Sequence, residues 1–194
     1  ELMGASHEGK IFLTQANKDL NPKKDDKGKV DSKLSKSGTI RSLLCFARAN
    51  GKVLWQKDVK YDIPETNWQD FPYCNASPVT DGERVVSFFG SSGLYCYDLA
   101  GKLLWSIPMG PFNNGFGAGS SPIMVDDYVI LSQDHDTDSF LMAVDKRTGK
   151  IVWRTDRSEF PRNYCTPTVW EVDGKKQIVV AATFTGTSLE LGVS

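Results

Sequence analysis

Three stretches of the chain repeat one five-residue pattern: Gly51-Lys52-Val53-Leu54-Trp55, Gly101-Lys102-Leu103-Leu104-Trp105 and Gly149-Lys150-Ile151-Val152-Trp153. Their tryptophans are 50 and 48 residues apart. A second marker recurs with nearly the same period, and its prolines are 44 and 45 residues apart: Ser77-Pro78-Val79, Ser121-Pro122-Ile123 and Thr166-Pro167-Thr168. Two independent markers that share almost one period indicate a repeat architecture.

Each period reads as four short strands separated by turns. In the second unit, Arg84 to Phe89 and Leu94 to Tyr97 are rich in β-branched and aromatic residues. No helical period of useful length occurs. Four strands in roughly 40 to 50 residues are typical of a propeller blade, whereas a β-sandwich, the alternative, does not require Gly and Trp at one place in each unit. We therefore predict an all-β fold, a partial β-propeller of four-stranded antiparallel blades, with about three and a half blades present.

The repeat assigns the whole chain, 1–194, to one propeller region. Blade 1 is predicted at about 1–59 with an inserted loop at 17–39, blade 2 at about 74–107, blade 3 at about 119–155, and a partial blade 4 at about 164–194. The insert holds seven lysines and four aspartates, which favours a solvated loop between two strands, with a basic docking loop as the alternative.

The number of predicted blades is smaller than the number that closes a propeller, about four to eight. Residues 187–194 do not continue into a third strand with another Gly-x-x-x-Trp turn, so blade 4 is expected to be incomplete. We interpret the chain as a fragment that missing blades would complete. A half-propeller that associates with another copy of itself, and one part of a longer split polypeptide, are the alternatives.

The residues that precede each Gly-x-x-x-Trp turn are Cys45-Phe46-Ala47, Cys96-Tyr97-Asp98 and Ala143-Val144-Asp145. With them the chain resembles the pyrroloquinoline-quinone-like (PQQ-like) β-propeller repeat family, and within it the secreted or periplasmic bacterial non-enzymatic members, more than WD40 or kelch proteins. The first copy departs from the family pattern, with Ala47 where Asp is usual. Cys45 and Cys96 align with Ala143, which predicts small, buried apolar side chains.

The resemblance also implies a role for the repeated Gly and Trp. In this family the tryptophan packs between neighbouring blades, its ring lies on a glycine-containing peptide, and its buried indole N–H needs a partner. The residues predicted to form this structural blade motif are Gly51, Trp55, Gly101, Trp105, Gly149 and Trp153.

Composition argues against several classes of partner. With 23 Lys and Arg, 24 Asp and Glu and a net charge of −1, the chain has no overall field that would attract nucleic acid or an anionic membrane. No apolar run is long enough for a transmembrane segment, and residues 1–10 do not form a signal peptide. The four cysteines include no C-x-x-C pair. The compartment therefore follows from the resemblance alone, which implies a periplasmic or extracellular location.

Two groups of residues are candidates for binding. Asp134, Asp136 and Asp138 alternate in one loop, and this pattern predicts a calcium site, with a solvated turn as the alternative. The site would not be an EF-hand, because Ser139 and Asp145 stand where an EF-hand needs Gly and Glu. The connections between blades carry aromatic, amide and arginine side chains that suit a protein or glycan ligand, or blade packing equally well. These ligand-loop candidates are Trp68, Tyr73, Asn113, Asn114, Phe116, Arg162 and Tyr164.

The sequence shows no catalytic constellation. His7 and His135 are the only histidines, and neither has the spacing of a base beside a nucleophile. We predict a non-catalytic binding or scaffold module, interacting with a protein or a glycan and without a cofactor. The alternative is a fragment of a PQQ-dependent quinoprotein dehydrogenase that would use PQQ with calcium. That family carries an adjacent cysteine pair, and none stands in this chain.

Overall fold

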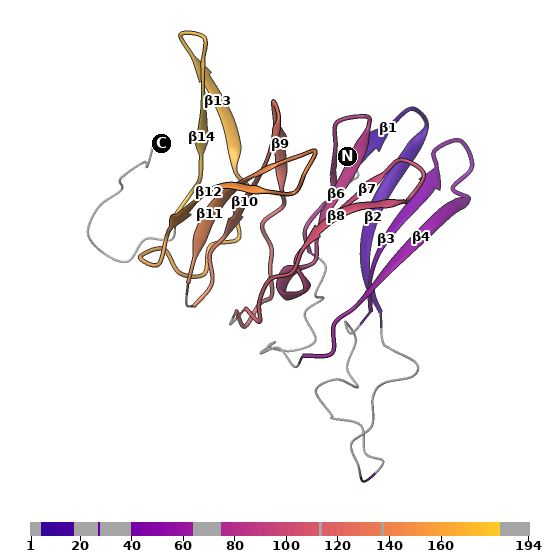
Figure 1. Cartoon of the computed structure of the whole chain (residues 1–194), viewed down its shortest axis with the longest axis horizontal. Coiled ribbons are helices and arrows are strands. Elements are labelled where there is room, and N and C mark those ends of the chain that lie inside the picture. The colour runs from indigo at the N-terminus through magenta and orange to yellow at the C-terminus, as the bar shows by residue number, and fades with distance from the viewer. Residues whose placement is uncertain are drawn as a thin grey trace.

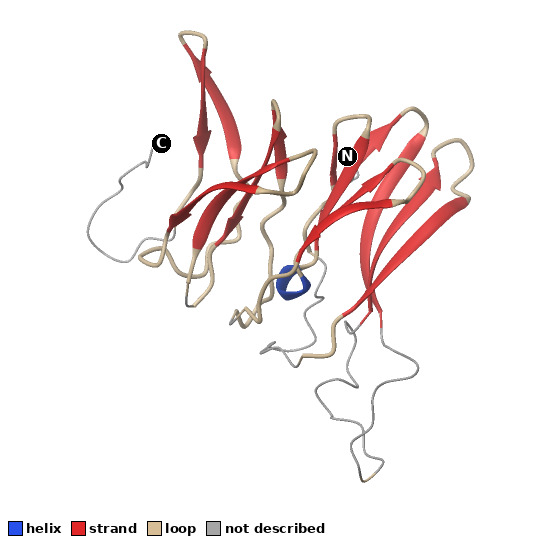
Figure 2. Ribbon diagram, in the orientation of Figure 1, coloured by secondary structure: helices blue, strands red, loops and turns tan. Residues whose placement is uncertain are grey.

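The computed structural model describes residues 5–17, 27, 40–63, 75–112, 114–136 and 138–182 of an all-β chain (Figures 1 and 2). Its strands form three four-stranded sheets and one two-stranded sheet, which spread from one another like the ribs of a fan. All neighbouring strands pair antiparallel. The predicted fold class, a partial β-propeller of four-stranded antiparallel blades, is confirmed. No helix among these residues is long and apolar enough to cross a membrane.

Each four-stranded sheet is a meander in chain order. Blade 1 contains β1 (Ala5–His7), β2 (Lys10–Asn17), β3 (Ile40–Ala47) and β4 (Val53–Lys60). Blade 2 contains β5 (Val79–Thr80), β6 (Arg84–Phe88), β7 (Leu94–Asp98) and β8 (Leu103–Ile107), with the 3-10 turn η1 (Gly90–Ser92) after β6. Blade 3 contains β9 (Ile123–Val125), β10 (Tyr128–Gln133), β11 (Phe140–Asp145) and β12 (Ile151–Asp156). Half-blade 4 contains β13 (Thr168–Val172) and β14 (Lys175–Val179).

The first strand, β1, was not predicted from the sequence. Its three residues include no β-branched side chain and no Phe, Tyr or Trp, so they carry no local strand signal. Pairing with β2, in which Ala5 lies opposite Phe12, holds it in place. The predicted insert at 17–39 falls between β2 and β3, and apart from Asn17 and Lys27 it lies outside the described residues.

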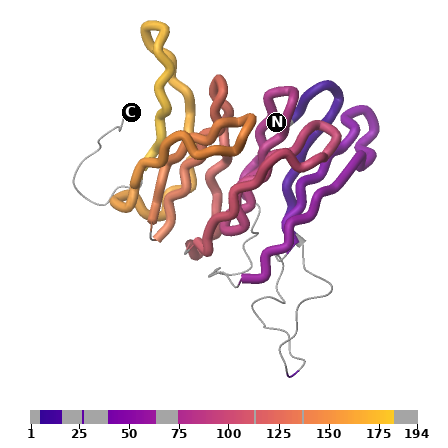
Figure 3. Tube along the Cα trace, viewed as in Figure 1, coloured from indigo at the N-terminus to yellow at the C-terminus, as the bar shows by residue number. Residues whose placement is uncertain are grey.

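The Ser/Thr-Pro segments lie beside the innermost strands of the blades, and hydrogen bonds connect these segments to one another. These strands lie side by side, because β1 contacts β5 and β5 contacts β9 (Figure 3). The Ser77 amide donates a hydrogen bond to the Ser121 hydroxyl at 2.9 Å, and the Ser121 amide donates one to the Thr166 hydroxyl at 3.1 Å. We name these three residues the hydroxyl belt. It links blade 2, blade 3 and half-blade 4 in sequence order.

Apolar side chains fill the joints between blades, because successive residues of a strand face opposite sides of its sheet. The joint between blades 1 and 2 buries Phe12, Leu43, Cys45, Val85, Phe89 and Tyr97. The joint between blades 2 and 3 is larger and includes Val86, Phe88, Cys96, Trp105, Val129, Leu131, Phe140, Met142 and Val144. Blade 3 meets half-blade 4 through Ile130, Leu141, Ala143, Val180 and their neighbours.

The Gly-x-x-x-Trp pattern forms the outer part of two joints. A β-bulge in each outer strand adds one residue before the tryptophan, which lies opposite a small residue of the adjacent strand: Cys45 with Trp55, Cys96 with Trp105, and Ala143 with Trp153. This pairing is a physical reason for the alignment of the two cysteines with an alanine.

The indole groups then reach across to the next blade. Trp55 Nε1 donates to the Leu99 carbonyl at 3.1 Å, and Trp105 Nε1 donates to the Lys146 carbonyl at 2.9 Å. A Cβ added to Gly149, whose φ is +73°, would lie 2.8 Å from the Trp105 ring. Trp105 is only 8% exposed, whereas Trp153, which has no such turn beside it among the described residues, is 36% exposed.

Candidate functional site

The two ends of the fan carry different connections. Because each sheet is an antiparallel meander, the turns after its first and third strands gather at one end, which we call the turn end (Figure 1). The remaining connections gather at the opposite end, the loop end. Its described segments are residue 27 and residues 61–63, 75–78, 89–93, 108–112, 114–122, 134–136, 138–139, 157–167 and 180–182. All the predicted binding residues that the structure describes lie in these segments.

A buried carboxylate ties three of these segments together. The Asp134 side chain is fully buried, and its oxygens accept hydrogen bonds from Arg157 Nε at 3.0 Å and Arg157 Nη2 at 2.9 Å. Asn163 Nδ2 donates to the same carboxylate at 3.2 Å. Arg157 and Asn163 also donate to the carbonyl of Ala181, just beyond β14. The network therefore fixes the loop of blade 3, the connection to half-blade 4 and the exit of β14 relative to one another.

A second acid–base pair lies nearer the surface. Arg162 Nε donates to the Asp136 carboxylate, and this hydrogen bond raises the pKa of the Arg162 guanidinium. Arg162 has a φ of +57°, a left-handed conformation that is uncommon for a residue other than glycine. The Arg162 side chain is 62% exposed, so it stays accessible while paired.

Tyr164, Asn114 and Phe116 form a third contact between loops. Tyr164 Oη donates to Asn114 Oδ1 at 2.7 Å, and the Phe116 amide donates to the same oxygen. The Phe116 and Tyr164 rings meet edge to face with centroids 6.2 Å apart. Burial raises the pKa of the Tyr164 hydroxyl, against the opposing effect of its bond to Asn114. Gly119 lies against the Tyr164 ring, where a Cβ would come within 3.0 Å.

The structure thus brings together four of the predicted ligand-loop residues: Asn114, Phe116, Arg162 and Tyr164. Trp68, Tyr73 and Asn113, also predicted, lie outside the described residues. Whether these side chains contact a ligand stays a prediction.

Sequence reasoning missed Arg157, Asn163 and the packing of His135. Arg157 and Asn163 lie 23 and 29 residues after Asp134, and no local pattern links them to it. His135 is buried against Phe112, with ring centroids 4.7 Å apart, and neither ring nitrogen forms a hydrogen bond. Burial lowers the pKa of its imidazole. His135 follows the last residue of β10, Gln133, by two positions, and this spacing is the one signal that could have placed it on the same side as that residue.

The three aspartates of the predicted calcium site are engaged separately. Asp134 binds Arg157 and Asp136 binds Arg162, while Asp138 is exposed at a left-handed φ of +59°. In the described part of the chain, no three His, Cys, Asp or Glu side chains are grouped so that they could hold a metal ion. A calcium site at these positions stays a prediction.

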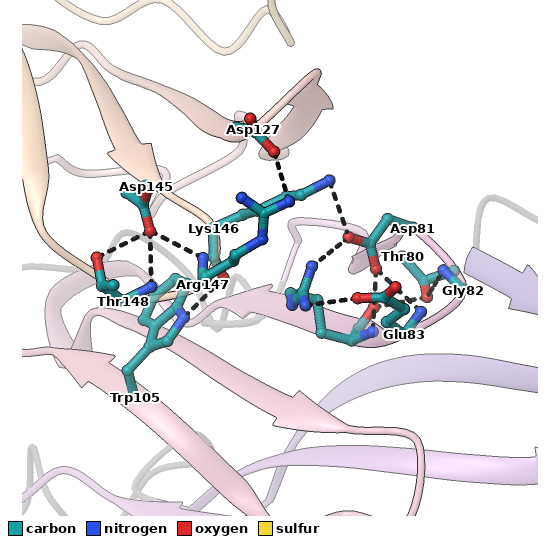
Figure 4. A network of polar contacts seen from close by, with 11 residues as sticks. Thr80, Asp81, Gly82, Glu83, Trp105, Asp127, Asp145, Lys146, Arg147 and Thr148 are labelled. Carbon is teal, nitrogen blue, oxygen red and sulfur yellow. Dashed lines mark hydrogen bonds and ion pairs between the residues drawn. The ribbon is translucent and has the colours of Figure 1, made fainter.

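A separate polar network ties blade 2 to blade 3 at the turn end (Figure 4). The Asp81 carboxylate accepts Lys146 Nζ at 3.2 Å and Arg84 Nη1 at 2.6 Å. Burial opposes ionisation, but hydrogen bonds from the Glu83 and Arg84 amides and from Lys146 hold the pKa of Asp81 below its ordinary value. Because the Lys146 carbonyl also accepts the Trp105 indole, the ion pair and the tryptophan joint share one residue. This network stabilises a joint.

One feature of the quinone site that the dehydrogenase alternative requires, an adjacent cysteine pair, does not occur in this chain. None of the four cysteines, at positions 45, 74, 96 and 165, is adjacent to another. Cys45 and Cys96 are buried in joints, and burial raises the pKa of the Cys96 thiol to about 12. Such a thiol stays protonated and unreactive near neutral pH.

Comparison with known proteins gives one family match. The family described as the outer membrane protein assembly factor BamB matches residues 40–191 of the chain. No curated protein matches the sequence.

Solved structures also align with parts of the chain. BamB from Moraxella catarrhalis aligns at 18% identity over 75% of this chain and 40% of its own length, with a TM-score of 0.47. A europium-containing methanol dehydrogenase aligns at 14% identity over 62% of this chain and 24% of its own, with a TM-score of 0.47. A quinohemoprotein alcohol dehydrogenase from Comamonas testosteroni aligns at 17% identity over 63% and 20%, with a TM-score of 0.45. The chain therefore spans well under half the length of each of them.

Proposed function

The chain belongs to the family of the outer membrane protein assembly factor BamB, and on that premise we propose that it is a non-catalytic propeller module that binds another protein through its loop end. One observation carries the proposal: the network at the joint of blade 3 and half-blade 4. The Asp134–Arg157 and Asp136–Arg162 pairs connect these loops to one another through charged hydrogen bonds. A partner would then lose little free energy in ordering them.

The chemistry of this surface suits a protein partner. Arg162 and Phe116 are exposed beside half-buried Tyr164, and arginine and tyrosine are enriched among the residues that dominate protein–protein affinity. The carboxylates of Asp134 and Asp136 are each engaged by an arginine. That arrangement favours a fixed surface over a general acid or base, which must exchange its proton during a reaction.

We propose that the module acts in the periplasm or outside a bacterial cell. The family name, which refers to outer membrane protein assembly, and the PQQ-like repeat both support this location. A glycan is the alternative ligand, because aromatic, amide and arginine side chains also suit sugars.

Photo-crosslinking from a defined position tests the proposed surface. A photoreactive phenylalanine analogue replaces Phe116 at the loop end and, as a matched exposed control, Glu83 at the turn end. Both variants are expressed in the periplasm of a bacterial host. We expect one discrete protein adduct from position 116 that disappears when Arg162→Glu is added, and no such adduct from position 83.

Three results would count against the proposal. Adducts of equal yield from both positions would show that the loop end is not selective. Binding to a glycan array with no protein adduct would favour a glycan ligand. A thermal shift with PQQ and calcium, accompanied by dye-linked alcohol oxidation, would favour the dehydrogenase alternative.

A further inference from the structure

The repeated Gly-Lys-x-x-Trp pattern contains three residues that the joints between blades do not use. Its glycine and tryptophan build the joints, whereas its lysine and the two residues after it are exposed in every copy. These residues lie at the turn end, where the outermost strands β4, β8 and β12 begin. The three exposed segments are Lys52-Val53-Leu54, Lys102-Leu103-Leu104 and Lys150-Ile151-Val152.

The β-bulge of each outermost strand presents one of these apolar residues to solvent. In blade 2 the pairing skips Leu104, because Cys96 and Tyr97 lie opposite the residues on either side of it. Leu54 and Val152 hold the same place in blades 1 and 3. Leu54, Leu104 and Val152 are 48%, 44% and 50% exposed. The bulge requires an extra residue at this place, but nothing in the joint requires that residue to be aliphatic.

The residue before each bulge is also apolar and about half exposed, so every blade presents two such side chains. Trp55, next to Leu54, lies against Gly101, which comes two residues before Leu103. Trp105 lies in the same way against Gly149. The exposed pairs therefore follow one another from blade to blade, and an exposed apolar surface of this kind is typical of an interaction site. We call it the outer apolar row, and its members are Val53, Leu54, Leu103, Leu104, Ile151 and Val152.

Basic residues accompany the outer apolar row. Residues 48–54, 99–104 and 146–152, which form the outer turns and the row, contain six Lys and Arg and no Asp or Glu. Lys146 and Arg147 pair with aspartates of neighbouring turns. The other four are exposed and form no ion pair with any residue that the structure describes: Arg48, Lys52, Lys102 and Lys150.

We propose that the outer apolar row and these four bases bind an acidic polypeptide segment that carries aliphatic side chains, on a surface separate from the loop end. The aliphatic side chains of the partner would cover the row, and its carboxylates would pair with the bases. The row crosses three sheets that spread like the ribs of a fan, so an extended segment can follow it from one blade to the next (Figure 1).

The charges of the turn end favour a polypeptide over an anionic bilayer. Glu8, Glu83 and Asp173 are exposed in the turns that follow the first strands of their sheets, at the same end of the molecule. A bilayer that covered this end would bring lipid phosphates close to these carboxylates. A narrow polypeptide along the outermost strands can contact the basic turns and leave the acidic turns in solvent.

Fluorescence anisotropy tests the surface with a fluorescein-labelled peptide that repeats Glu-Leu-Leu. Peptides that repeat Lys-Leu-Leu and Glu-Ser-Ser are the controls for charge and for apolar contact. We expect the Glu-Leu-Leu peptide to bind at least about tenfold more tightly than either control. Its affinity should fall as the salt concentration rises, because salt screens contacts between exposed charges.

Variants of the row locate the contact. Leu54→Asp, Leu104→Asp and Val152→Asp together should weaken binding at least about tenfold. Ile63→Asp is the matched control, because Ile63 is an aliphatic residue that is 50% exposed at the loop end, and it should leave binding unchanged. Urea unfolding verifies that the variants are folded, and substitutions at exposed positions are expected to change the midpoint little. The adduct from position 116 should persist in the triple variant, so the two surfaces can fail separately.

Reversing the charges gives a second readout at positions that precede the strands. Lys52→Glu, Lys102→Glu and Lys150→Glu together should abolish binding of the Glu-Leu-Leu peptide and create binding of the Lys-Leu-Leu peptide. The proposal fails if the Glu-Leu-Leu peptide does not bind, if the peptides bind equally, if either triple variant binds as the unaltered chain does, or if Ile63→Asp weakens binding as much. Sedimentation with phosphatidylglycerol vesicles in place of peptide binding would assign the row to a lipid surface. Self-association that the aspartate variant abolishes would assign it to a second copy of the chain.

Discussion

Replacing Gly149 by alanine should destabilise the chain by about 2 to 4 kcal/mol, whereas the same change at Gly51 should cost about 1 kcal/mol. The two glycines sit in matched turns, since the Gly51 amide donates to the Ala47 carbonyl at 2.8 Å and the Gly149 amide donates to the Asp145 carbonyl at 2.9 Å. Their φ angles are +70° and +73°. Comparing Gly51→Ala with Gly149→Ala therefore separates the free-energy cost of backbone strain from the cost of a steric contact with Trp105.

The expected magnitudes follow from what each new Cβ would meet. Both alanines adopt a left-handed conformation, at a cost of about 1 kcal/mol. At position 51 the Cβ meets nothing within 4 Å of the described atoms. At position 149 it lies 2.8 Å from the Trp105 ring, so the indole must move and lose its bond to the Lys146 carbonyl. A buried donor left without a partner costs about 1 to 3 kcal/mol more.

Urea unfolding followed by far-UV circular dichroism measures both variants. A change in midpoint with an unchanged slope reports stability alone. In a Trp105→Phe background the excess cost of Gly149→Ala should shrink, because the indole N–H is gone. Equal shifts for Gly51→Ala and Gly149→Ala would refute the idea that Trp105 packs on the glycine turn of the next blade.

Three more predictions concern single groups. Arg157→Met should destabilise the chain by about 3 to 5 kcal/mol in urea unfolding, because it leaves the Asp134 carboxylate buried and unpaired, and adding Asp134→Leu should recover part of the loss. The pKa of Asp81 is lowered in the folded chain, so its contribution to the free energy of unfolding is present above the unfolded pKa of about 3.9 and is lost as pH falls through that value toward the folded pKa. Asp81→Asn should therefore make the free energy of unfolding less dependent on pH in this acid range. An unchanged pH dependence in the variant would contradict this prediction. A thiol reagent at neutral pH should label exposed Cys165 in the folded chain but not Cys96, because burial raises the pKa of the Cys96 thiol to about 12. Mass spectrometry of the digested protein locates the label, and labelling of Cys96 in place of Cys165 would contradict the prediction.

The fold was predictable because its signal is local and recurs. Trp55, Trp105 and Trp153 each follow a turn glycine by four residues, and that spacing survives in any environment. The strand β1 was missed because pairing with β2, rather than its own residues, makes it a strand. Local pattern predicts elements that carry their own signal and misses those that a neighbour imposes.

The candidate site was harder to predict because its contacts are long-range. The spacing of Asp134, Asp136 and Asp138 looks like that of a cation loop, yet the chain turns these side chains toward different partners. The partner of Asp134, Arg157, lies 23 residues later, and no local pattern links the two residues. Contacts between residues far apart in the chain cannot be read from a single sequence. The loops at the loop end could therefore be predicted as candidates for binding, but the hydrogen bonds between them could not.

The tryptophan joint has a consequence for how such a chain can lengthen. Blade 2 contributes Trp105 to the joint that follows it and the turn glycine Gly101 to the joint before it, where Trp55 of blade 1 packs. A tandem duplication of one unit would therefore bring both halves of a new joint with it. Blade number could then change by copying DNA, with no compensating substitution at either border, while the loops diverge independently toward new ligands.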